Sequence, residues 1–324
     1  MPSFKKYTFN MFLQWIKTSD IARSLIPAIS LYVISSVLAP GYFLSPYNQK
    51  ILLMQITPLL AIATGEMLII LMGSIDLTPG SAQGVTAMAA ALVYITTNNF
   101  ILSIFVALSL GLIIGSINGI LVTKLRIFSF VATLAGLVIW RAVDLWISGG
   151  KLIYGLKPFE IFSISISIVP IGFLIMLSIN IIIFILLKYT AFGRYIYGLG
   201  SNEEAIRLAG VRADLIKFIA FVISGLIYSI GGILLIGMSG LAVDPWSARG
   251  YELNAIAACV LGGIVLTGGS GHPLGVIFGT ILLTLLMNIL VILGLTEVSI
   301  QQIIVGIVLI AAATALSRGL KYVK

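Results

Sequence analysis

The stretch FILSIFVALSLGLIIGSINGILV, residues 100–122, contains no charged side chain. A bilayer core about 30 Å thick is crossed by a helix of about 20 apolar residues. The stretch is therefore long and apolar enough to span a membrane as a single helix. Comparable stretches follow one another along most of the chain, so this pattern decides the fold class.

The chain is predicted to be an all-α polytopic membrane protein with about ten transmembrane helices. The ten predicted spans are 24–40, 49–72, 77–97, 100–122, 127–148, 167–187, 215–238, 251–267, 273–293 and 298–316. They form one membrane domain over residues 24–318, preceded by a leader (1–23) and followed by a tail (319–324). The spans 77–97 and 251–267 are rich in small residues, which favours packing inside a bundle over exposure to lipid.

Composition excludes several other classes of protein. Of the 324 residues, 60% are hydrophobic and only 9% are charged, whereas roughly 25% are charged in an ordinary soluble domain. A soluble enzyme, a disordered chain and a disulfide-stapled domain are therefore ruled out. With one cysteine (Cys259) and one histidine (His272), we expect no disulfide, no zinc site and no catalytic triad.

The positive charges predict the orientation of the chain. If the N-terminus is inside, 14 Lys and Arg lie in inner segments and four lie in outer segments. This bias favours cytoplasmic N- and C-termini, which requires an even number of spans. The net charge of +8 is spread thinly at span ends, so it fits membrane topology better than nucleic-acid binding. The leader, 1–23, lacks the features of a signal peptide and is either a surface amphipathic helix or an unstructured segment.

The longest polar stretch lies in the inner loop 188–214. Asn202 can cap a short helix of about two turns. Glu203 and Glu204 stand in its first turn, where the helix dipole favours acids, and Gly210 can end it. The alternative is a solvated loop with a single helical turn.

A weak internal repeat relates two parts of the chain. Residues 117–139 align without gaps on 287–309, so that Asn118 falls on Asn288. The repeat relates spans four and five to spans nine and ten. An offset of five spans makes the two five-helix halves inverted in the membrane, as in many transporters.

Five charged residues lie in or beside the predicted spans, where lipid contact is costly. They are Glu66, Asp76, Arg141, Asp144 and Glu252. The i, i+3 spacing of Arg141 and Asp144 predicts an ion pair on one helix. The spacing assigns no partner to Glu66.

The segment GSIDLTPGS, residues 73–81, interrupts the helical pattern between spans two and three. Pro79 stops helical hydrogen bonding, and Gly73 and Gly80 allow a tight reversal. Asp76 and Thr78 are expected to cap the following span. The glycine-rich run 250–271 lacks the lysine of a phosphate-binding loop, so no nucleotide site is expected in this chain.

Several motifs, in the same order, resemble the ribose-type permeases of bacterial ABC importers, within the branched-chain amino acid and ribose permease superfamily. They are GSIDLTPGS (73–81), SINGILVTKLRIFSFVATL (116–134), AFGRYIYGLGSNEEAIRLAGVR (191–212), GYELNAIAACVLGG (250–263) and GGSGHPLG (268–275). The resemblance covers about residues 50–318. Ser74 departs from the family pattern, which commonly has a glycine there, and 149–165 does not map onto it.

The resemblance implies a permease subunit without enzymatic activity of its own. It implies a second permease chain in a homo- or heterodimer, cytoplasmic ATPase subunits that carry ATP and Mg, and an extracytoplasmic sugar-binding protein. The chain itself would need no cofactor. It would lie in the bacterial inner membrane, in contact with lipid and without nucleic acid. Alternating access, driven by the ATPase, would carry a ribose-like monosaccharide across.

The resemblance also assigns candidate site residues. The family's ATPase-coupling helix matches Asn202, Glu203, Glu204, Ala205, Arg207, Leu208 and Gly210. Small and polar residues of the spans are candidates for the substrate pathway: Asp76, Thr86, Asn118, Glu252, Asn254 and Asn288. For the asparagines, the alternative is a hydrogen bond between helices that serves packing only.

Three other functions remain open at the level of sequence. An ion-driven secondary transporter could use Glu66, Asp76 and Glu252 as a proton or sodium relay. A permease of the same type could carry nucleosides, a signalling furanose or branched-chain amino acids. A membrane scaffold is the third, although a scaffold has no need of broken helices and buried charges.

Overall fold

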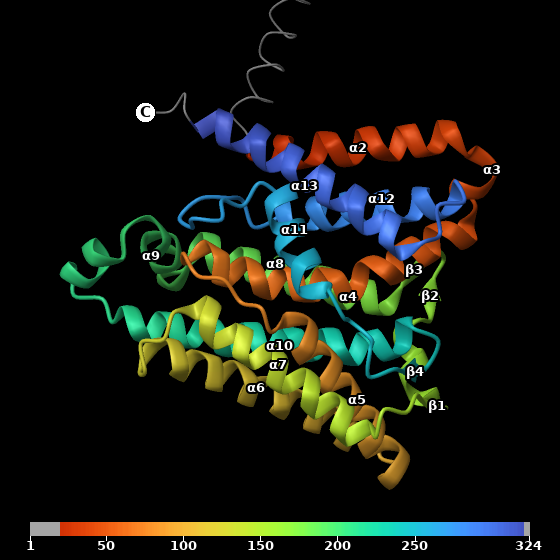
Figure 1. The fold of residues 1–324 in the computed structure, drawn as a ribbon, viewed down its shortest axis with the longest axis horizontal. Coiled ribbons are helices and arrows are strands. Elements are labelled where there is room, and N and C mark those ends of the chain that lie inside the picture. The colour runs from red at the N-terminus through yellow and green to blue at the C-terminus, as the bar shows by residue number, and fades with distance from the viewer. Residues whose placement is uncertain (1–19, 321–324) are drawn as a thin grey trace, which may run out of the picture.

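The computed structural model describes residues 20–320 of the chain. Most helices run roughly side by side along the longest axis of the molecule, and α9 projects at one end (Figure 1). The α-helices are α2 (Asp20–Leu38), α3 (Pro40–Phe43), α4 (Pro46–Leu71), α5 (Pro79–Thr97), α6 (Phe100–Thr123), α7 (Ser129–Ser148), α8 (Ile171–Tyr189), α9 (Ala191–Leu208), α10 (Ala213–Met238), α11 (Tyr251–Leu261), α12 (Gly275–Ile292) and α13 (Val298–Leu320). The leader 1–23, expected to be either a surface amphipathic helix or an unstructured segment, lies largely outside the described residues.

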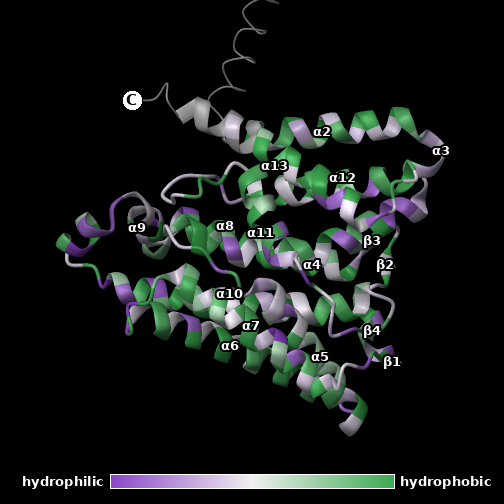
Figure 2. Cartoon of the chain, viewed as in Figure 1, coloured by the Kyte–Doolittle hydropathy of each residue, from purple (hydrophilic) through white to green (hydrophobic). Residues whose placement is uncertain are grey.

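Six of these helices are long and apolar enough to cross a membrane, by length and composition: α4, α6, α7, α8, α10 and α12. Shorter apolar stretches lie in α2, α11 and α13, at Ser24–Leu38, Tyr251–Leu261 and Ser299–Ala311. Apolar residues predominate along the helices (Figure 2). The expectation of an all-α membrane protein is therefore confirmed, and the count of ten spans stays a prediction.

The centre of the molecule is built on α4 and α10. Over their most apolar 18 residues, these two helices are 83% and 72% buried, against 28% for α6 and 22% for α7. The outer helices instead expose large apolar side chains such as Phe105, Val138 and Ile182. Exposed apolar surface on this scale fits a lipid environment.

Glycines allow the central helices to approach closely. At Gly225 of α10, an added Cβ atom would lie 2.8 Å from the Cα atom of Gly115 on α6. Backbones in such contact gain van der Waals packing, which replaces the hydrophobic driving force that is absent between helices in lipid.

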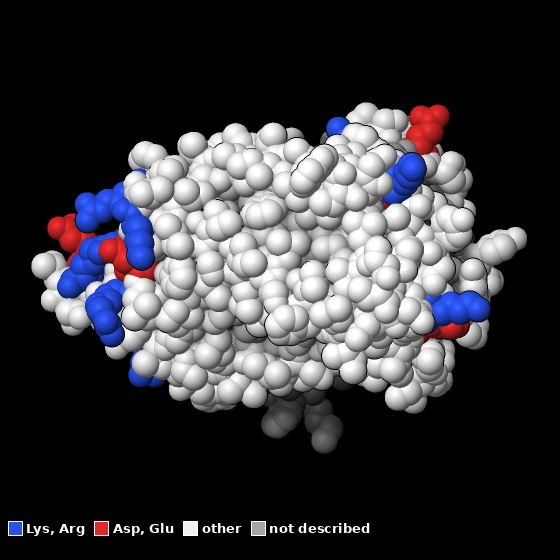
Figure 3. Space-filling model, turned by 90° about the horizontal axis from the view of Figure 1, so that it is seen from below, with Lys and Arg blue, Asp and Glu red and all other residues white. Residues whose placement is uncertain are grey.

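Charged residues gather at the two ends of the molecule. The face in Figure 3 shows Lys, Arg, Asp and Glu side chains at the α9 end and at the opposite end, with an uncharged belt between them. A belt without charge is expected of the surface that lies in the hydrocarbon core.

The end opposite α9 carries short structure that the sequence did not predict. Strand β1 (Ile153–Tyr154) pairs antiparallel with β4 (Ala242–Val243), and β2 (Ser165–Ile166) pairs with β3 (Val169–Pro170). The 3₁₀-helix η1 (Lys157–Phe162) buries Phe159 against an aromatic cluster that includes Phe100. These pairs satisfy backbone groups that no helix satisfies.

The helix bounds agree with the predicted spans to within a few residues, except at one place. The span predicted over 251–267 ends as a helix at Leu261. The backbone then turns at Gly263, whose φ of +81° favours glycine. At Gly262 an added Cβ would lie 2.6 Å from the carbonyl oxygen of Gly275, so the chain needs glycine there to pass α12. Residues 262–274 are therefore an irregular segment and not the end of a span.

Candidate functional site

The projecting helix α9 consists of two helical parts separated at Asn202. The backbone of Asn202 is non-helical, with φ −162° and ψ 97°. Its side-chain Oδ1 accepts a hydrogen bond from the backbone N–H of Ala205 at 3.0 Å, as an N-cap does. At the other end, Gly210 has φ +79°, and its N–H donates to the carbonyl of Arg207. The predicted short helix, capped at Asn202 and ended at Gly210, is confirmed; below, residues 202–210 are called the α9 tip.

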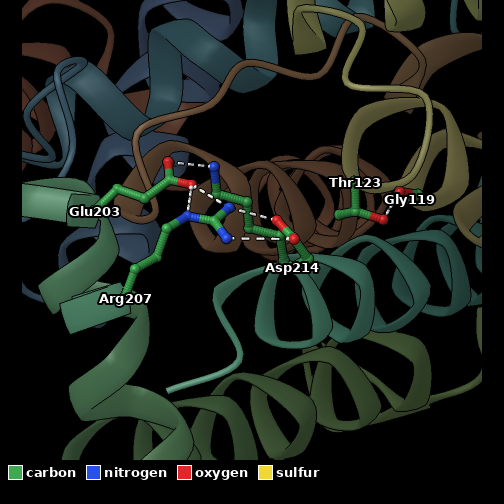
Figure 4. A network of polar contacts seen from close by, with 6 residues as sticks. Gly119, Thr123, Glu203, Arg207 and Asp214 are labelled. Carbon is green, nitrogen blue, oxygen red and sulfur yellow. Dashed lines mark hydrogen bonds and ion pairs between the residues drawn. The ribbon is translucent and has the colours of Figure 1, made fainter. Parts of the chain in front are cut away.

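An ion network ties the α9 tip to the first turns of α10 (Figure 4). Arg207 donates from Nε and Nη2 to Glu203 Oε1, at 3.1 and 2.8 Å. It also donates from Nη1 to Asp214 Oδ2 at 3.3 Å and from Nη2 to Asp214 Oδ1. Lys217 donates to the second oxygen of Glu203. Two carboxylates and two cations on two helices thus form one connected set.

The network shifts the ionisation of the groups on α9. Partial burial acts to raise the pKa of Glu203, but the hydrogen bonds from Lys217 and Arg207 outweigh it and lower this pKa. The hydrogen bonds to Asp214 and Glu203 raise the pKa of Arg207. Glu203 and Arg207 are therefore both charged at neutral pH, as their ion pair requires.

The α9 tip thus has a bound face and a free face. Glu203 and Arg207 bond to side chains of α10, although Arg207 is itself partly open to solvent, and Glu204, Ala205 and Leu208 are exposed. The Leu208 side chain is 82% exposed. The sequence did not lead us to predict Asp214 and Lys217 as part of this site. Their i, i+3 spacing at the start of α10 is the pattern from which they could have been predicted.

A cavity of about 590 Å³ lies beside the network. It is lined by Gly73 and Ser74 after α4, by Arg126 and Ser129 at the turn between α6 and α7, and by the network residues. Near it, Thr123 donates to the carbonyl of Gly119 within α6 at 2.6 Å (Figure 4).

The first part of α9, before Asn202, contacts both irregular segments of the chain, 72–78 after α4 and 262–274 after α11. The segment after α4 and the segment after α11 come together here: Gly269 N–H donates to the carbonyl of Leu71 at 2.9 Å. An added Cβ at Gly268 would lie 2.7 Å from the Cα of Gly73 and 2.9 Å from the Cα of Gly200 on α9. In addition, the Tyr197 hydroxyl donates to the carbonyl of Gly271 at 2.8 Å. A displacement of α9 therefore reaches both irregular segments directly.

Asp76 lies at the centre of a buried polar network. Its Oδ1 accepts from the N–H and hydroxyl of Thr78, at 2.8 and 2.6 Å, and its Oδ2 accepts from the Tyr228 hydroxyl at 3.3 Å. Asn118 donates to the Thr78 hydroxyl oxygen at 2.9 Å, and Glu66 Oε1 accepts from the Asp76 N–H at 3.2 Å. The network joins three helices, α4, α6 and α10, to the segment 72–78. It supplies the partner for Glu66 that the sequence did not reveal.

One expectation for this segment is wrong. Thr78 occupies the N-cap position of α5, but its side chain makes no capping hydrogen bond. Its hydroxyl instead donates to Asp76, so that both side chains fix the turn and neither caps the helix. Gly80 does not form the reversal either: it lies within α5, where an added Cβ would be 2.6 Å from the carbonyl oxygen of Ala248.

The predicted ion pair between Arg141 and Asp144 does not form as a direct contact, although the guanidinium and the carboxylate still attract each other electrostatically. Arg141 lies 3.8 Å from Glu252 Oε2 on α11 and donates to the carbonyls of Ser247 and Ala248, at 3.0 and 3.2 Å. Asp144 is fully buried, and neither of its carboxylate oxygens has a hydrogen-bond partner. The guanidinium points toward the loop before α11, where two backbone carbonyls accept its hydrogen bonds, and toward the carboxylate of Glu252 on α11.

The remaining predicted pathway residues lie in two places. Thr86 is buried between α5 and α10, and its hydroxyl donates to the carbonyl of Ala82 in its own helix at 2.7 Å. Asn254 and Asn288 line one pocket, of about 340 Å³, together with Asn48. Thus the six predicted pathway residues do not form one site: Asp76 and Asn118 share a network, Asn254 and Asn288 share a pocket, and Glu252 pairs with Arg141. Within residues 20–320, no three His, Cys, Asp or Glu side chains gather as metal ligands would.

Comparison with known proteins gives a consistent result. The family model for permease components of branched-chain amino acid transport systems matches residues 50–313. The autoinducer 2 import system permease protein LsrC of Yersinia enterocolitica is 38% identical over 292 residues, which are 89% of this chain and 80% of that protein. LsrC of Yersinia pseudotuberculosis is 38% identical over 288 residues, covering 87% of this chain and 81% of the relative. No solved structure matches.

The matched region extends from α4 into α13, so it contains both irregular segments and the whole of α9. A family match over so much of the chain, together with relatives at this level of identity, assigns the family. The chain is a membrane transport component and belongs to the family of permease components of branched-chain amino acid transport systems.

Proposed function

We propose that this chain is the permease subunit of an ATP-binding-cassette importer that carries a monosaccharide across the bacterial inner membrane. Family membership and the sugar-importer motifs support the class of transporter. The relatives are named for import of autoinducer 2, which makes that compound the first alternative cargo. ATP hydrolysis belongs to separate ATPase subunits, because this sequence contains no phosphate-binding loop.

The observation that carries the proposal is the position of α9. The free face of the α9 tip, with Glu204, Ala205 and Leu208, is the surface that docks on the ATPase. The bound face transmits the force, since its ion network makes the tip move together with α10. The first part of α9 contacts the segments after α4 and after α11, so ATPase closure displaces both together and alternates access to the pathway.

The packing of the helices supports two inverted five-helix halves. In the first half α5 packs on α6 and α7, and in the second α11 packs on α12 and α13. Between the halves, α10 packs on α6 as α4 packs on α12. On this reading ten helices span the membrane and both termini are cytoplasmic, on the side of α9. A second permease chain completes the pathway, and an extracytoplasmic binding protein docks at the β1–β4 end.

Copurification tests the coupling role. We expect a tagged chain, extracted from native membranes in mild detergent, to bring a soluble ATPase with it. Ala205→Arg places a long cation on the free face and should release the ATPase. Ala191→Arg, the same change at an exposed position at the other end of α9, should retain it.

Two results would overturn the proposal. One is that no ATPase is recovered with the unaltered chain. The other is that uptake by cells collapses with an uncoupler while ATP is maintained, which would indicate a secondary transporter. In that case the buried acids Glu66 and Asp76 would become the coupling site to study.

A further inference from the structure

The pocket that contains Asn254 and Asn288 is lined by apolar side chains and by uncharged polar groups. It has a volume of about 340 Å³ and lies between α4, α11, α12 and α13, and none of its twelve lining residues is charged. Five of them carry carboxamides, contributed by all four helices: Asn48, Gln55, Asn254, Asn288 and Gln301. Carboxamides are uncommon in membrane-spanning segments, because each has donors and acceptors that lipid cannot satisfy.

Two of these carboxamides are fixed in place by each other. Asn48 Nδ2 donates to Asn288 Oδ1 at 3.2 Å, and Asn288 Nδ2 donates to Asn48 Oδ1 at 2.9 Å. Asn48 also donates to the carbonyl of Phe43, so both of its N–H groups are used. Asn288 keeps a second N–H. The pair is therefore a rigid edge of the pocket.

The other carboxamides keep hydrogen-bonding capacity toward the pocket. Gln301 donates to the carbonyl of Leu295 at 2.9 Å, which leaves its side-chain oxygen as an acceptor. The carboxamide of Asn254 has no hydrogen bond among the described residues, and it keeps two donors and an acceptor. The pocket therefore offers both donors and acceptors from different sides.

Thr284 supplies the observation that points to a ligand. Its side chain is only 4% exposed, it lines the pocket, and its hydroxyl has no hydrogen-bond partner. One turn earlier on the same helix, the Thr280 hydroxyl donates to the carbonyl of Val276 at 2.8 Å. A buried polar group without a partner is rare and costs free energy. Unlike the Thr280 hydroxyl, the Thr284 hydroxyl makes no hydrogen bond to a carbonyl of its own helix. It is therefore available to a ligand in the pocket.

We propose that this pocket, hereafter the carboxamide pocket, binds an uncharged polyhydroxyl compound of the monosaccharide class on its way through the membrane. Amide and hydroxyl groups match the paired donor and acceptor character of sugar hydroxyls. A phosphorylated or carboxylated compound would find no counter-charge among the lining residues. The volume lies at the lower end of the roughly 300–1,000 Å³ range of small-molecule sites, which suits one small sugar. This assignment of a cargo site rests on the proposed function.

The position of the carboxamide pocket connects it to α9. Tyr251 and Asn254 line it from the first turns of α11. The segment that follows α11 reaches α9 at Gly268 and Gly271. A shift of α9 can therefore move α11 against α4 and α12, which widens or closes the pocket.

Thiol protection tests this site directly. Ile51 lines the pocket without carrying a carboxamide, and the single natural cysteine, Cys259, is fully buried. In the assembled transporter, Ile51→Cys is labelled with N-ethylmaleimide in the presence of D-ribose, D-xylose, D-glucose or ribose 5-phosphate. We expect at least one uncharged sugar to slow the labelling and ribose 5-phosphate to have no effect.

Paired threonine variants separate binding from structure. Thr284→Val in the Ile51→Cys chain should raise the half-protecting sugar concentration about three- to tenfold, the loss of one hydrogen bond. Its thermal midpoint should be unchanged or higher, since the hydroxyl it removes has no partner. Thr280→Val, one turn away, should leave the protection constant within about twofold.

The outcomes distinguish this inference from the proposed function. ATP-dependent import of a sugar that gives no protection would overturn the carboxamide pocket and leave the proposed function standing. Protection by sugar without ATP-dependent import would uphold the pocket and overturn the proposed function. Equal effects of Thr284→Val and Thr280→Val would also overturn the pocket.

Discussion

Arg207 illustrates why a single guanidinium can orient a helix. Its planar guanidinium donates from Nη1 and Nη2 to Asp214, and from Nε and Nη2 to Glu203. An ammonium group cannot reproduce this geometry. The side chain is 45% exposed, so solvent screens each pair and the contribution to stability is small. The value of the network lies in fixing the angle between the α9 tip and α10.

A double-mutant cycle with Arg207→Gln and Asp214→Asn tests this link. We expect a coupling energy of about 0.5–1 kcal/mol in unfolding measurements on the detergent-solubilised protein, as for partly exposed pairs in a network. The coupling should weaken as salt is added, because screening lengths fall with ionic strength. Additive effects of the two substitutions would show that the pair does not form.

The lowered pKa of Glu203 predicts a pH dependence with a definite sign. A carboxylate whose folded-state pKa lies below its unfolded value, here 4.5, stabilises the fold at pH above that value. This stability is lost as the pH falls through the lower, folded-state pKa. The difference in thermal midpoint between the unaltered chain and Glu203→Gln should therefore be constant above about pH 5 and shrink below pH 4.5. A difference that grows on acidification would contradict the network.

At the scale of elements, close backbone contact holds the central helices. Gly115 on α6 and Gly225 on α10 form such a contact, and neither leaves room for a methyl group. Because lipid is as apolar as the helix surface, this packing and a few buried hydrogen bonds must replace the hydrophobic effect between spans.

Gly225→Ala should therefore destabilise the protein by about 1–3 kcal/mol, the usual cost of overpacking. An added Cβ would lie 2.8 Å from two backbone atoms of Gly115, which cannot rotate away. Gly306→Ala on α13 is the matched control, because nothing lies within 4 Å of its added Cβ. Alanine should stabilise that helix by up to about 1 kcal/mol. Equal effects in an unfolding titration would show that α6 and α10 are not in contact.

The sequence predicts helices well and irregular elements poorly, for a physical reason. The ends of a helix such as 100–122 can be predicted from its apolar run alone, because hydrogen bonding within one helix satisfies the backbone. The end of α11 at Leu261 depends on the passage of α12 past Gly262, a contact between distant segments. Strands β1 and β4 pair residues about ninety positions apart, and their two-residue lengths leave no periodicity to detect.

The same distinction holds for the candidate site. The cap at Asn202 and the stop at Gly210 are local, and the sequence predicts both. The partners of Arg141 and Glu66 are set by tertiary packing, and the sequence misses them. Asn254 and Asn288 were singled out as polar residues in spans, but their meeting with Asn48 in one pocket depends on how α4, α11 and α12 assemble.

At the scale of the whole molecule, α9 is the one described element that contacts both irregular segments and also extends beyond the bundle (Figure 1). On the proposed function, motion that enters at the exposed tip would pass to α10 through the ion network and to 262–274 through the hydrogen bond of Tyr197. Since α11 both lines the carboxamide pocket and precedes that segment, the molecule has a continuous route from tip to pocket.

Removing one contact on this route should separate ATP hydrolysis from transport. Tyr197→Phe deletes the hydroxyl that donates to the carbonyl of Gly271, a loss of about 0.5–1.5 kcal/mol. In vesicles containing the assembled transporter, we expect ATP hydrolysis to persist while import falls several-fold, so that more ATP is consumed for each sugar carried. Tyr195→Phe, two residues away on a partly exposed side chain with no hydrogen bond among the described residues, should leave the ratio unchanged. Parallel loss of hydrolysis and import in Tyr197→Phe would place its role in ATPase docking, and an unchanged ratio would mean that force passes through α10 alone.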